Sequence, residues 1–118
     1  MSEGPVEPVL CHSHVGNGLA ELTLFIPPDL AQCEGHFPGQ PVLPGVVQVD
    51  WAVLLAARHL GLAIESAQKL QVKFRRVTVP GMTVVLRLQH VPARRRLTFE
   101  YRCEDDILSS GSIALPQS

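Results

Sequence analysis

One carboxyl group and one histidine stand close enough in the sequence to act as an acid–base pair. Asp50 lies in the most apolar stretch of the chain, residues 46–60, where eleven of fifteen residues are apolar. A carboxyl group enclosed by apolar side chains keeps its proton and needs either a partner or a chemical role. His36 precedes it by fourteen residues, in the run GHFPG. A histidine beside a protonated carboxyl group makes a pair that transfers protons near neutral pH.

The residues between the pair supply the remaining part of a site. Pro44-Gly45 is typical of a helix start, where free backbone amides stabilise negative charge. Amides at Gly45 therefore suit a developing enolate oxygen. Together the three positions predict proton abstraction beside a carbonyl, coupled to protonation of a leaving group. Composition alone also allows a plainer interpretation, in which His36 is a hydrogen-bonded loop residue and Asp50 a solvent-facing or capping residue.

The elements that must position these groups form an α+β pattern. The apolar run predicts one buried helix over 46–60, and Gly61 suits its end. Residues 27–45 predict a long ordered loop, which in a small domain usually serves function. Alternating apolar residues predict five or six mostly antiparallel strands that curl around the helix, at 9–15, 19–26, 70–79 with a bulge at Arg75-Arg76, 83–91, 97–103 and 107–115.

Length and composition exclude several classes of protein. The 118 residues are 46% apolar with a mean hydropathy of +0.17, which predicts one folded domain over 1–118 with a loose lead-in at 1–8. No window is long enough to cross a bilayer, and the basic start of a signal peptide is missing. The three cysteines form no C-x-x-C pair, and His12 and His14 have no evident third ligand, so we expect no metal site and a cytoplasmic setting.

Charge is divided unevenly along the chain. Residues 1–57 contain six acidic and no basic residues, whereas residues 58–118 contain ten basic and five acidic ones. This division favours a face that meets an acidic partner, although solvated strand faces would give the same count. Nucleic-acid binding is disfavoured because the isoelectric point is near 6.5 and few aromatic residues accompany the charges. The candidate basic patch consists of Lys73, Arg75, Arg76, Arg87, Arg94, Arg95, Arg96 and Arg102.

Two blocks of the sequence resemble one enzyme family. The run HFPGQPVLPGVVQVDWA (residues 36–52) is similar to the signature H-F-P-G-x-P-x-x-P-G-V-x-x-x-[ED]-A of the beta-hydroxyacyl-[acyl carrier protein] dehydratases, and KFRRVTVPG (73–81) is similar to a second family block. The resemblance implies a hot-dog fold over nearly the whole chain, with a curved antiparallel sheet wrapped around one central helix. The short length and the Asp-Trp pair look most like the stand-alone dehydratases of aryl-polyene and related lipid clusters.

The resemblance also implies roles for individual residues. His36 would remove the C2 proton of a (3R)-3-hydroxyacyl thioester, Asp50 would protonate the departing hydroxyl, and the Gly45 amide would hold the thioester carbonyl. The substrate would arrive on acyl carrier protein, with no metal or redox cofactor, and each active site would lie at a homodimer interface. Docking of the carrier would use some of Arg75, Arg76, Arg94, Arg95 and Arg96, and the acyl tunnel would be lined by Phe37, Pro44, Val46, Trp51 and Leu54.

Three positions depart from the family pattern. The acid is Asp50, as in the dehydratase/isomerase branch, which implies isomerase side activity. Trp51 replaces a small residue, and Leu54 stands where many members have a glutamine that could orient the carboxyl group one turn away. Two other functions therefore stay open: thioester hydrolysis on the same fold, and non-catalytic binding of an acyl group or its carrier.

Overall fold

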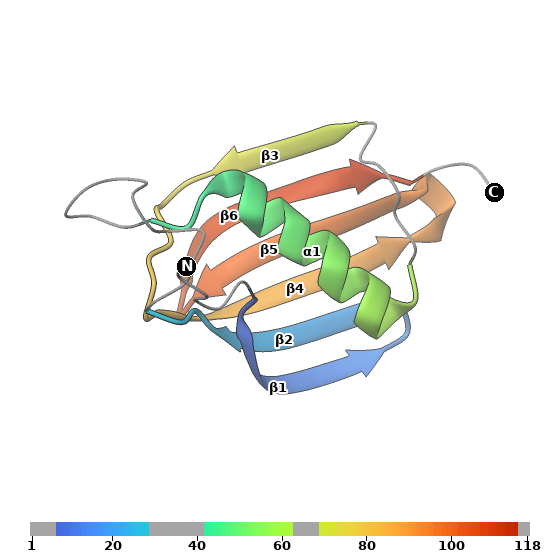
Figure 1. The fold of residues 1–118 in the computed structure, drawn as a ribbon. Helices are drawn as coiled ribbons and strands as arrows, with labels where there is room; N and C mark the ends of the chain where they lie inside the picture. The colour runs from blue at the N-terminus through green and yellow to red at the C-terminus, as the bar shows by residue number, and fades with distance from the viewer. Residues whose placement is uncertain (1–6, 29–41, 63–68, 116–118) are drawn as a thin grey trace, which may run out of the picture.

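In the part of the chain that the structure describes, six antiparallel strands form one sheet, and one α-helix lies across its inner face (Figure 1). The computed structural model describes residues 7–28, 42–62 and 69–115. The strand order across the sheet is β1-β2-β4-β5-β6-β3, so β1 and β3 are the edge strands. The bounds are β1 Val9–Gly16, β2 Leu19–Phe25, α1 Gly45–Leu60, β3 Leu70–Phe74, β4 Thr83–Val91, the short 3₁₀ helix η2 Pro92–Arg94, β5 Arg96–Cys103 and β6 Asp106–Ala114.

The inner face of the sheet is built by strict alternation. On β2, Leu22 and Leu24 are fully buried, and their cross-strand partners on β4, Leu86 and Val84, are buried with them. β5 continues the same layer with buried side chains at alternate positions, namely Leu97, Phe99 and Tyr101. Because the period of a strand is two, this pattern directs one face of every central strand toward the helix. The prediction of a curved sheet around one helix is confirmed.

Helix α1 starts and ends close to the positions that Pro44-Gly45 and Gly61 predict. It begins at Gly45, one residue before the expected start, and ends at Leu60. Gly61 adopts the left-handed conformation with φ 70° and returns its N–H to the carbonyl of Ala56, which is the usual glycine end of a helix. Figure 1 shows the helix crossing the sheet from beside β3 and β6 toward β2. No helix in the described ranges has the length and apolar character needed to span a membrane.

The strand predicted over 70–79 is shorter than expected. β3 ends at Phe74, and residues 75–79 do not continue the sheet. The amides of Arg75 and Arg76 both donate to the carbonyl of Leu108, at 2.9 and 3.1 Å. When two successive amides donate to one carbonyl, their strand has one residue more than its partner, as in a β-bulge. The strand then bends away from the β6 ladder. The bulge was therefore placed correctly, but the continuation of the strand through Val77 was wrong.

Candidate active site

Asp50 lies on the side of α1 that faces away from the sheet. Its neighbours Val49 and Trp51 are buried, whereas Asp50 is exposed, as is Val46 one turn earlier. The expectation that the chain's own core encloses this carboxyl group is therefore wrong. The physical reason is helical phase, because positions four and eight residues apart share one face. Arg58, eight residues after Asp50, is exposed on the same side.

At the start of α1, beside this face, two backbone donors have no acceptor among the described residues. The carbonyl of Pro44 accepts from the amides of Val47 and Gln48, at 3.1 and 3.2 Å. Within the described ranges, the amides of Gly45 and Val46 have no recorded acceptor. Pro44 offers no side-chain cap, and the first turn contains no acidic residue that would neutralise the positive end of the helix. These two amides are therefore available to a negatively charged or carbonyl oxygen.

The ring of Phe74 lies against Gly45, the first residue of the helix. A Cβ atom at Gly45 would stand 2.5 Å from Cζ of Phe74 and 3.0 Å from Cε1. The ring, which is 53% exposed, would have to move to make room. This contact joins β3 to the helix start, so Gly45 lies against the ring of Phe74.

Two cavities flank this contact. One, of about 290 Å³, lies between the helix start and residues 74–78, and the other, of about 390 Å³, lies between α1 and β3. Gly45 and Phe74 line both, and Val46 and Val49 line the second. The first cavity also contains the buried hydroxyl group of Thr78, for which the described part of the chain offers no hydrogen-bond partner. An apolar cavity with a few convergent polar groups is the usual form of a small-molecule site.

The other tunnel-lining predictions have different outcomes. Trp51 is only 3% exposed and belongs to the core, and Leu54 is half-buried. Neither residue lines the two cavities at the helix start, and Pro44 does not line them either. His36 and Phe37 lie outside the described residues. The pairing of His36 with Asp50 therefore stays a prediction.

A buried polar cluster beneath the helix start was missed by sequence reasoning. Gln48 is 3% exposed, and its side-chain amide contacts Ser109 and Leu43, while its main-chain carbonyl contacts Tyr101. Burial raises the pKa of the Tyr101 phenol, so that this group remains a neutral donor. The only signal in the sequence was a glutamine in an apolar run, and it does not identify partners that are more than fifty residues away.

The basic residues do not form one patch. Arg75 and Arg76 follow β3 and line the cavity beside the helix start. Arg94 and Arg95 lie in the connection between β4 and β5, at the opposite end of the sheet. Along the β3–β6 pair, Phe74 lies opposite Ser109 at one end, and Leu70 lies opposite Ile113 at the other end. Arg96 pairs with Ala114, one residue beyond Ile113, so the β4–β5 connection lies at the Leu70 end. The expectation of a single basic patch is therefore wrong, since alternate hairpins place these residues at opposite ends.

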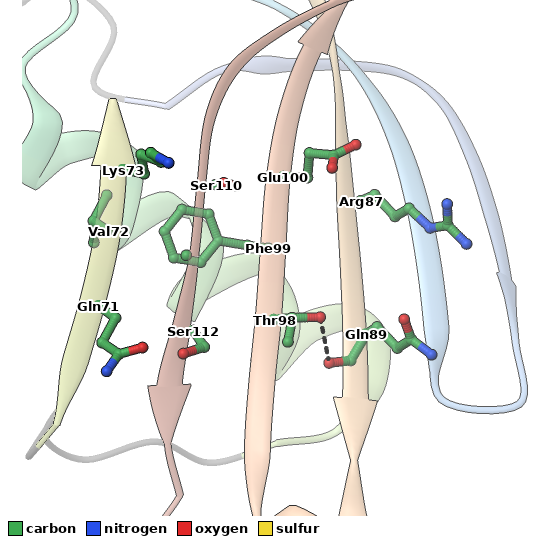
Figure 2. A pocket seen from close by; sticks show the side chains of 11 residues that line it. Gln71, Val72, Lys73, Arg87, Gln89, Thr98, Phe99, Glu100, Ser110 and Ser112 are labelled. Carbon is green, nitrogen blue, oxygen red and sulfur yellow. Dashed lines mark hydrogen bonds between the residues drawn. The ribbon is translucent and has the colours of Figure 1, made fainter. Parts of the chain in front are cut away.

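Lys73 and Arg87 belong to the outer face of the sheet, opposite the helix. Figure 2 shows them on either side of Ser110 and Glu100, with α1 behind the strands. This face contains a hollow of about 560 Å³ above the small side chains of β6. Its polar residues alternate with the buried ones of the core, and Glu100 already contacts Arg102 at 3.4 Å. This arrangement is that of a solvated sheet face, and Asp50 is not among the described residues that line it.

An uncovered apolar surface surrounds the helix start, and we call it the edge patch. Its members are large apolar residues with 43–68% of their surface exposed, on the edge strand β3, just after it and on the first turn of α1: Val46, Leu70, Phe74 and Val77. β3 pairs with β6 on one side, and no strand of the described residues pairs with its other edge. Contiguous exposed apolar surface of this kind marks a binding interface.

Comparison with known proteins places the chain among dehydratases. The family model described as ApeI-like (ApeI dehydratase) matches residues 12–112. A solved structure described as the dehydratase heterocomplex ApeI:P from Xenorhabdus doucetiae superposes with a TM-score of 0.84 at 33% identity, over 94% of this chain and 99% of that one. The dehydratase domain of PpsC from Mycobacterium tuberculosis, at 20% identity and a TM-score of 0.68, shares the fold over 97% of this chain and 45% of that one.

Curated relatives point to the same family. The 3-hydroxyacyl-[acyl-carrier-protein] dehydratase FabZ of Rickettsia massiliae is 33% identical over 96 residues, which are 70% of this chain and 61% of that protein. The FabZ of Roseobacter denitrificans is 38% identical over 64 residues, 47% of this chain and 42% of that protein. The chain thus spans less than two thirds of the length of these curated relatives. The family match over residues 12–112 and the full-length structural likeness show that this chain belongs to the ApeI-like dehydratase family.

Proposed function

We propose that this protein dehydrates (3R)-3-hydroxyacyl thioesters on acyl carrier protein to trans-2-enoyl thioesters, in fatty-acid or polyene-type lipid synthesis. The observation that carries the proposal is the place of Asp50. Its carboxyl group stands on an uncovered apolar helix face, one turn after two free backbone amides. A proton donor and an oxyanion site at this spacing suit a β-elimination next to a thioester carbonyl.

The proposed reaction needs only proton transfers. The imidazole of His36 removes a proton from C2, and the electron pair of that C–H bond becomes the C2–C3 double bond. The C3–O bond breaks, and Asp50 gives its proton to the departing hydroxyl group, which leaves as water. The amide of Gly45 hydrogen-bonds the thioester oxygen while negative charge develops there. No electrons leave the substrate, so the proposed steps involve no redox cofactor, and the residues named here carry every proton transfer.

The direct experiment distinguishes dehydration from the other functions of this fold. A 3-hydroxyacyl carrier protein is incubated with the enzyme, and intact-protein mass spectrometry follows the acyl carrier. Loss of one water from the loaded carrier supports the proposal. Release of free carrier thiol would instead identify a thioesterase, and a stable complex with an unchanged acyl group would identify a binding protein.

We further propose that a second copy of the chain covers the edge patch. β3 has an open edge that can pair with another strand, and its exposed side chains Leu70 and Phe74 are apolar. Exposed edges are normally paired or covered, and a two-fold axis lets two β3 edges pair with each other. A second copy there would also remove water from the face that carries Asp50. His36 of one subunit would then act with Asp50 of the other.

Mixing two inactive variants tests this shared site. His36→Ala and Asp50→Asn would each be inactive alone. In a mixed dimer, one of its two sites would combine the intact His36 of one chain with the intact Asp50 of the other. After subunit exchange, half of the dimers are mixed, so we expect turnover to return to about a quarter of the wild-type value. Turnover that stays at the level of the separate variants would show that each site is built from one chain.

We propose Arg75 and Arg76 as the docking residues for the carrier protein. Both line the cavity beside the helix start, where the thioester must enter. Arg76 is 3.7 Å from Asp106, but 64% of its side chain is exposed, so this weak contact leaves the guanidinium available to an acidic partner. Arg94 and Arg95 lie at the far end of the sheet and are too remote to guide the arm of a carrier into this cavity.

Charge reversal at the two ends of the sheet separates these alternatives. We expect Arg75→Glu with Arg76→Glu to raise the KM for carrier-bound substrate by about tenfold, because electrostatic complementarity mainly controls encounter. The KM for a short pantetheine thioester should not change. The matched control, Arg94→Glu with Arg95→Glu, makes the same charge change at the opposite end and should leave both KM values alone. If the control raised the KM for carrier-bound substrate equally, docking would not be specific to Arg75 and Arg76, and either the Arg94 end of the sheet or net charge alone would account for it.

A further inference from the structure

The side-chain amide of Gln48 joins three elements in the core. Its Oε1 accepts a hydrogen bond from the Ser109 hydroxyl on β6 at 2.7 Å, and its Nε2 donates to the carbonyl of Leu43 at 3.3 Å. The main-chain carbonyl of Gln48 accepts from the Tyr101 hydroxyl on β5 at 2.6 Å. A buried amide is costly unless its donors and acceptors are paired, and here both ends of the side chain are paired. The orientation of the amide is fixed, because the carbonyl of Leu43 can only accept.

The bond to Leu43 holds the segment that leads into the helix. The amide of Leu43 also donates to the carbonyl of Thr78 at 2.6 Å. Leu43 is therefore held on one side by the connection that follows β3 and on the other by α1. Leu43 is separated from Gly45 only by Pro44, whose fixed φ transmits the position of one peptide to the next. The free amides at Gly45 and Val46 are thus placed through these two hydrogen bonds.

We infer that Gln48 is a positioning residue, which fixes Leu43 so that the free amides at the helix start meet the thioester oxygen. This inference rests on the proposed function. Oxyanion donors act only within a few tenths of an ångström of the right place, and a shift of about 1 Å can lower a rate about 100-fold. The Gln48 side chain is 3% exposed at the wall of the cavity beside the helix start, and both ends of its amide are engaged by Leu43 and Ser109.

Two substitutions at the same position separate positioning from stability. Gln48→Met has nearly the same volume but can neither donate to Leu43 nor accept from Ser109. We expect kcat to fall by about 10- to 100-fold while KM stays within about twofold of wild type. Gln48→Glu keeps an acceptor for Ser109 but opposes the Leu43 carbonyl when it is ionised. When it is protonated, its O–H can donate to Leu43, as the amide does.

Gln48→Glu therefore has a pH signature that a structural role would not produce. Its kcat relative to wild type should rise as pH falls and the introduced carboxyl group takes up a proton. Among the described residues, the charged or titratable groups around this position are Tyr101 beneath it, and Arg75 and Arg76 on the wall of the shared cavity. Tyr101 stays neutral because burial raises its pKa. All other residues are the same in both proteins, so the ratio to wild type isolates the introduced group.

The experiment measures kcat, KM and thermal unfolding for wild type, Gln48→Met, Gln48→Glu and Ser109→Ala between pH 5 and about pH 8. Ser109→Ala removes only the supporting bond and should lower kcat less than Gln48→Met does. If Gln48→Met does not fold, the pH-dependent ratio of Gln48→Glu and the effect of Ser109→Ala decide. Wild-type kcat in folded Gln48→Met, or a Gln48→Glu ratio that is flat with pH, would overturn the inference. Wild-type protein without dehydratase activity would instead refute the proposed function, and it is assayed first.

Discussion

Asp50→Asn should lower kcat for dehydration by about 1,000-fold, since a positioned general acid contributes about 10²- to 10⁴-fold. The amide has the shape of the carboxyl group but has no acidic proton to give to the departing hydroxyl. KM should change little, because the lost interaction is made in the transition state. The measurement is the rate of water loss from a 3-hydroxyacyl carrier protein, followed by mass spectrometry.

Controls for Asp50→Asn exploit its exposed position. The side chain faces away from the core, so the unfolding midpoint should match that of wild type. Asp105→Asn makes the same chemical change in the exposed turn between β5 and β6 and should leave turnover unchanged. Asp50→Glu keeps the acid and should retain part of the activity. A kcat for Asp50→Asn within about threefold of wild type would remove this residue from the mechanism.

Much of the fold could be predicted from the spacing of apolar residues and from the residues that end helices and strands. The alternation in residues 19–26 and 97–103 identified the faces of β2 and β5 correctly, because burial on one side of a sheet imposes a period of two. Gly61 ended the helix as expected, because its left-handed conformation favours glycine. The end of β3 at Phe74 could not be predicted, since it depends on the carbonyl of Leu108, a contact between segments distant in the sequence.

The roles of the motif residues stay predictions, and their surroundings could not be predicted. The motif placed Gly45 and Asp50 near the start of the helix, where Gly45 is the first residue of α1 and Asp50 is exposed in its second turn. Sequence reasoning placed Asp50 in the core because the run around it is apolar, although its phase with Arg58 marks the outward side of the helix. The partners of Gln48 could not be found from the sequence, since Tyr101 and Ser109 reach it only after β5 and β6 pair.

The edge patch explains why an apolar run surrounds an exposed carboxyl group. In a single chain, Val46 and Val77 each expose 68% of their surface, which is unfavourable unless another surface covers them. A second copy would cover these side chains and Asp50 together. The apolar residues around Asp50 therefore belong to two surfaces, one packed on the sheet and one exposed in the single chain, which the proposed second copy would cover. The sequence pattern alone does not separate the two.

Leu70→Asp should convert the dimer to monomers and lower turnover by at least about 100-fold, because an unpaired charge in an interface core costs several kcal/mol. A matched control exists on the opposite edge strand: Leu70 on β3 is 43% exposed, and Leu10 on β1 is 44% exposed. Both changes place the same poor strand former at an edge, so their intrinsic effects on folding should be alike.

Light scattering over a range of concentrations and the dehydration assay report the outcome. Leu10→Asp should remain dimeric and active. If Leu10→Asp dissociates instead, the interface lies at β1. If Leu70→Asp stays dimeric and active, β3 is not where the two chains meet, and the completion of the site of Asp50 by a second chain is wrong.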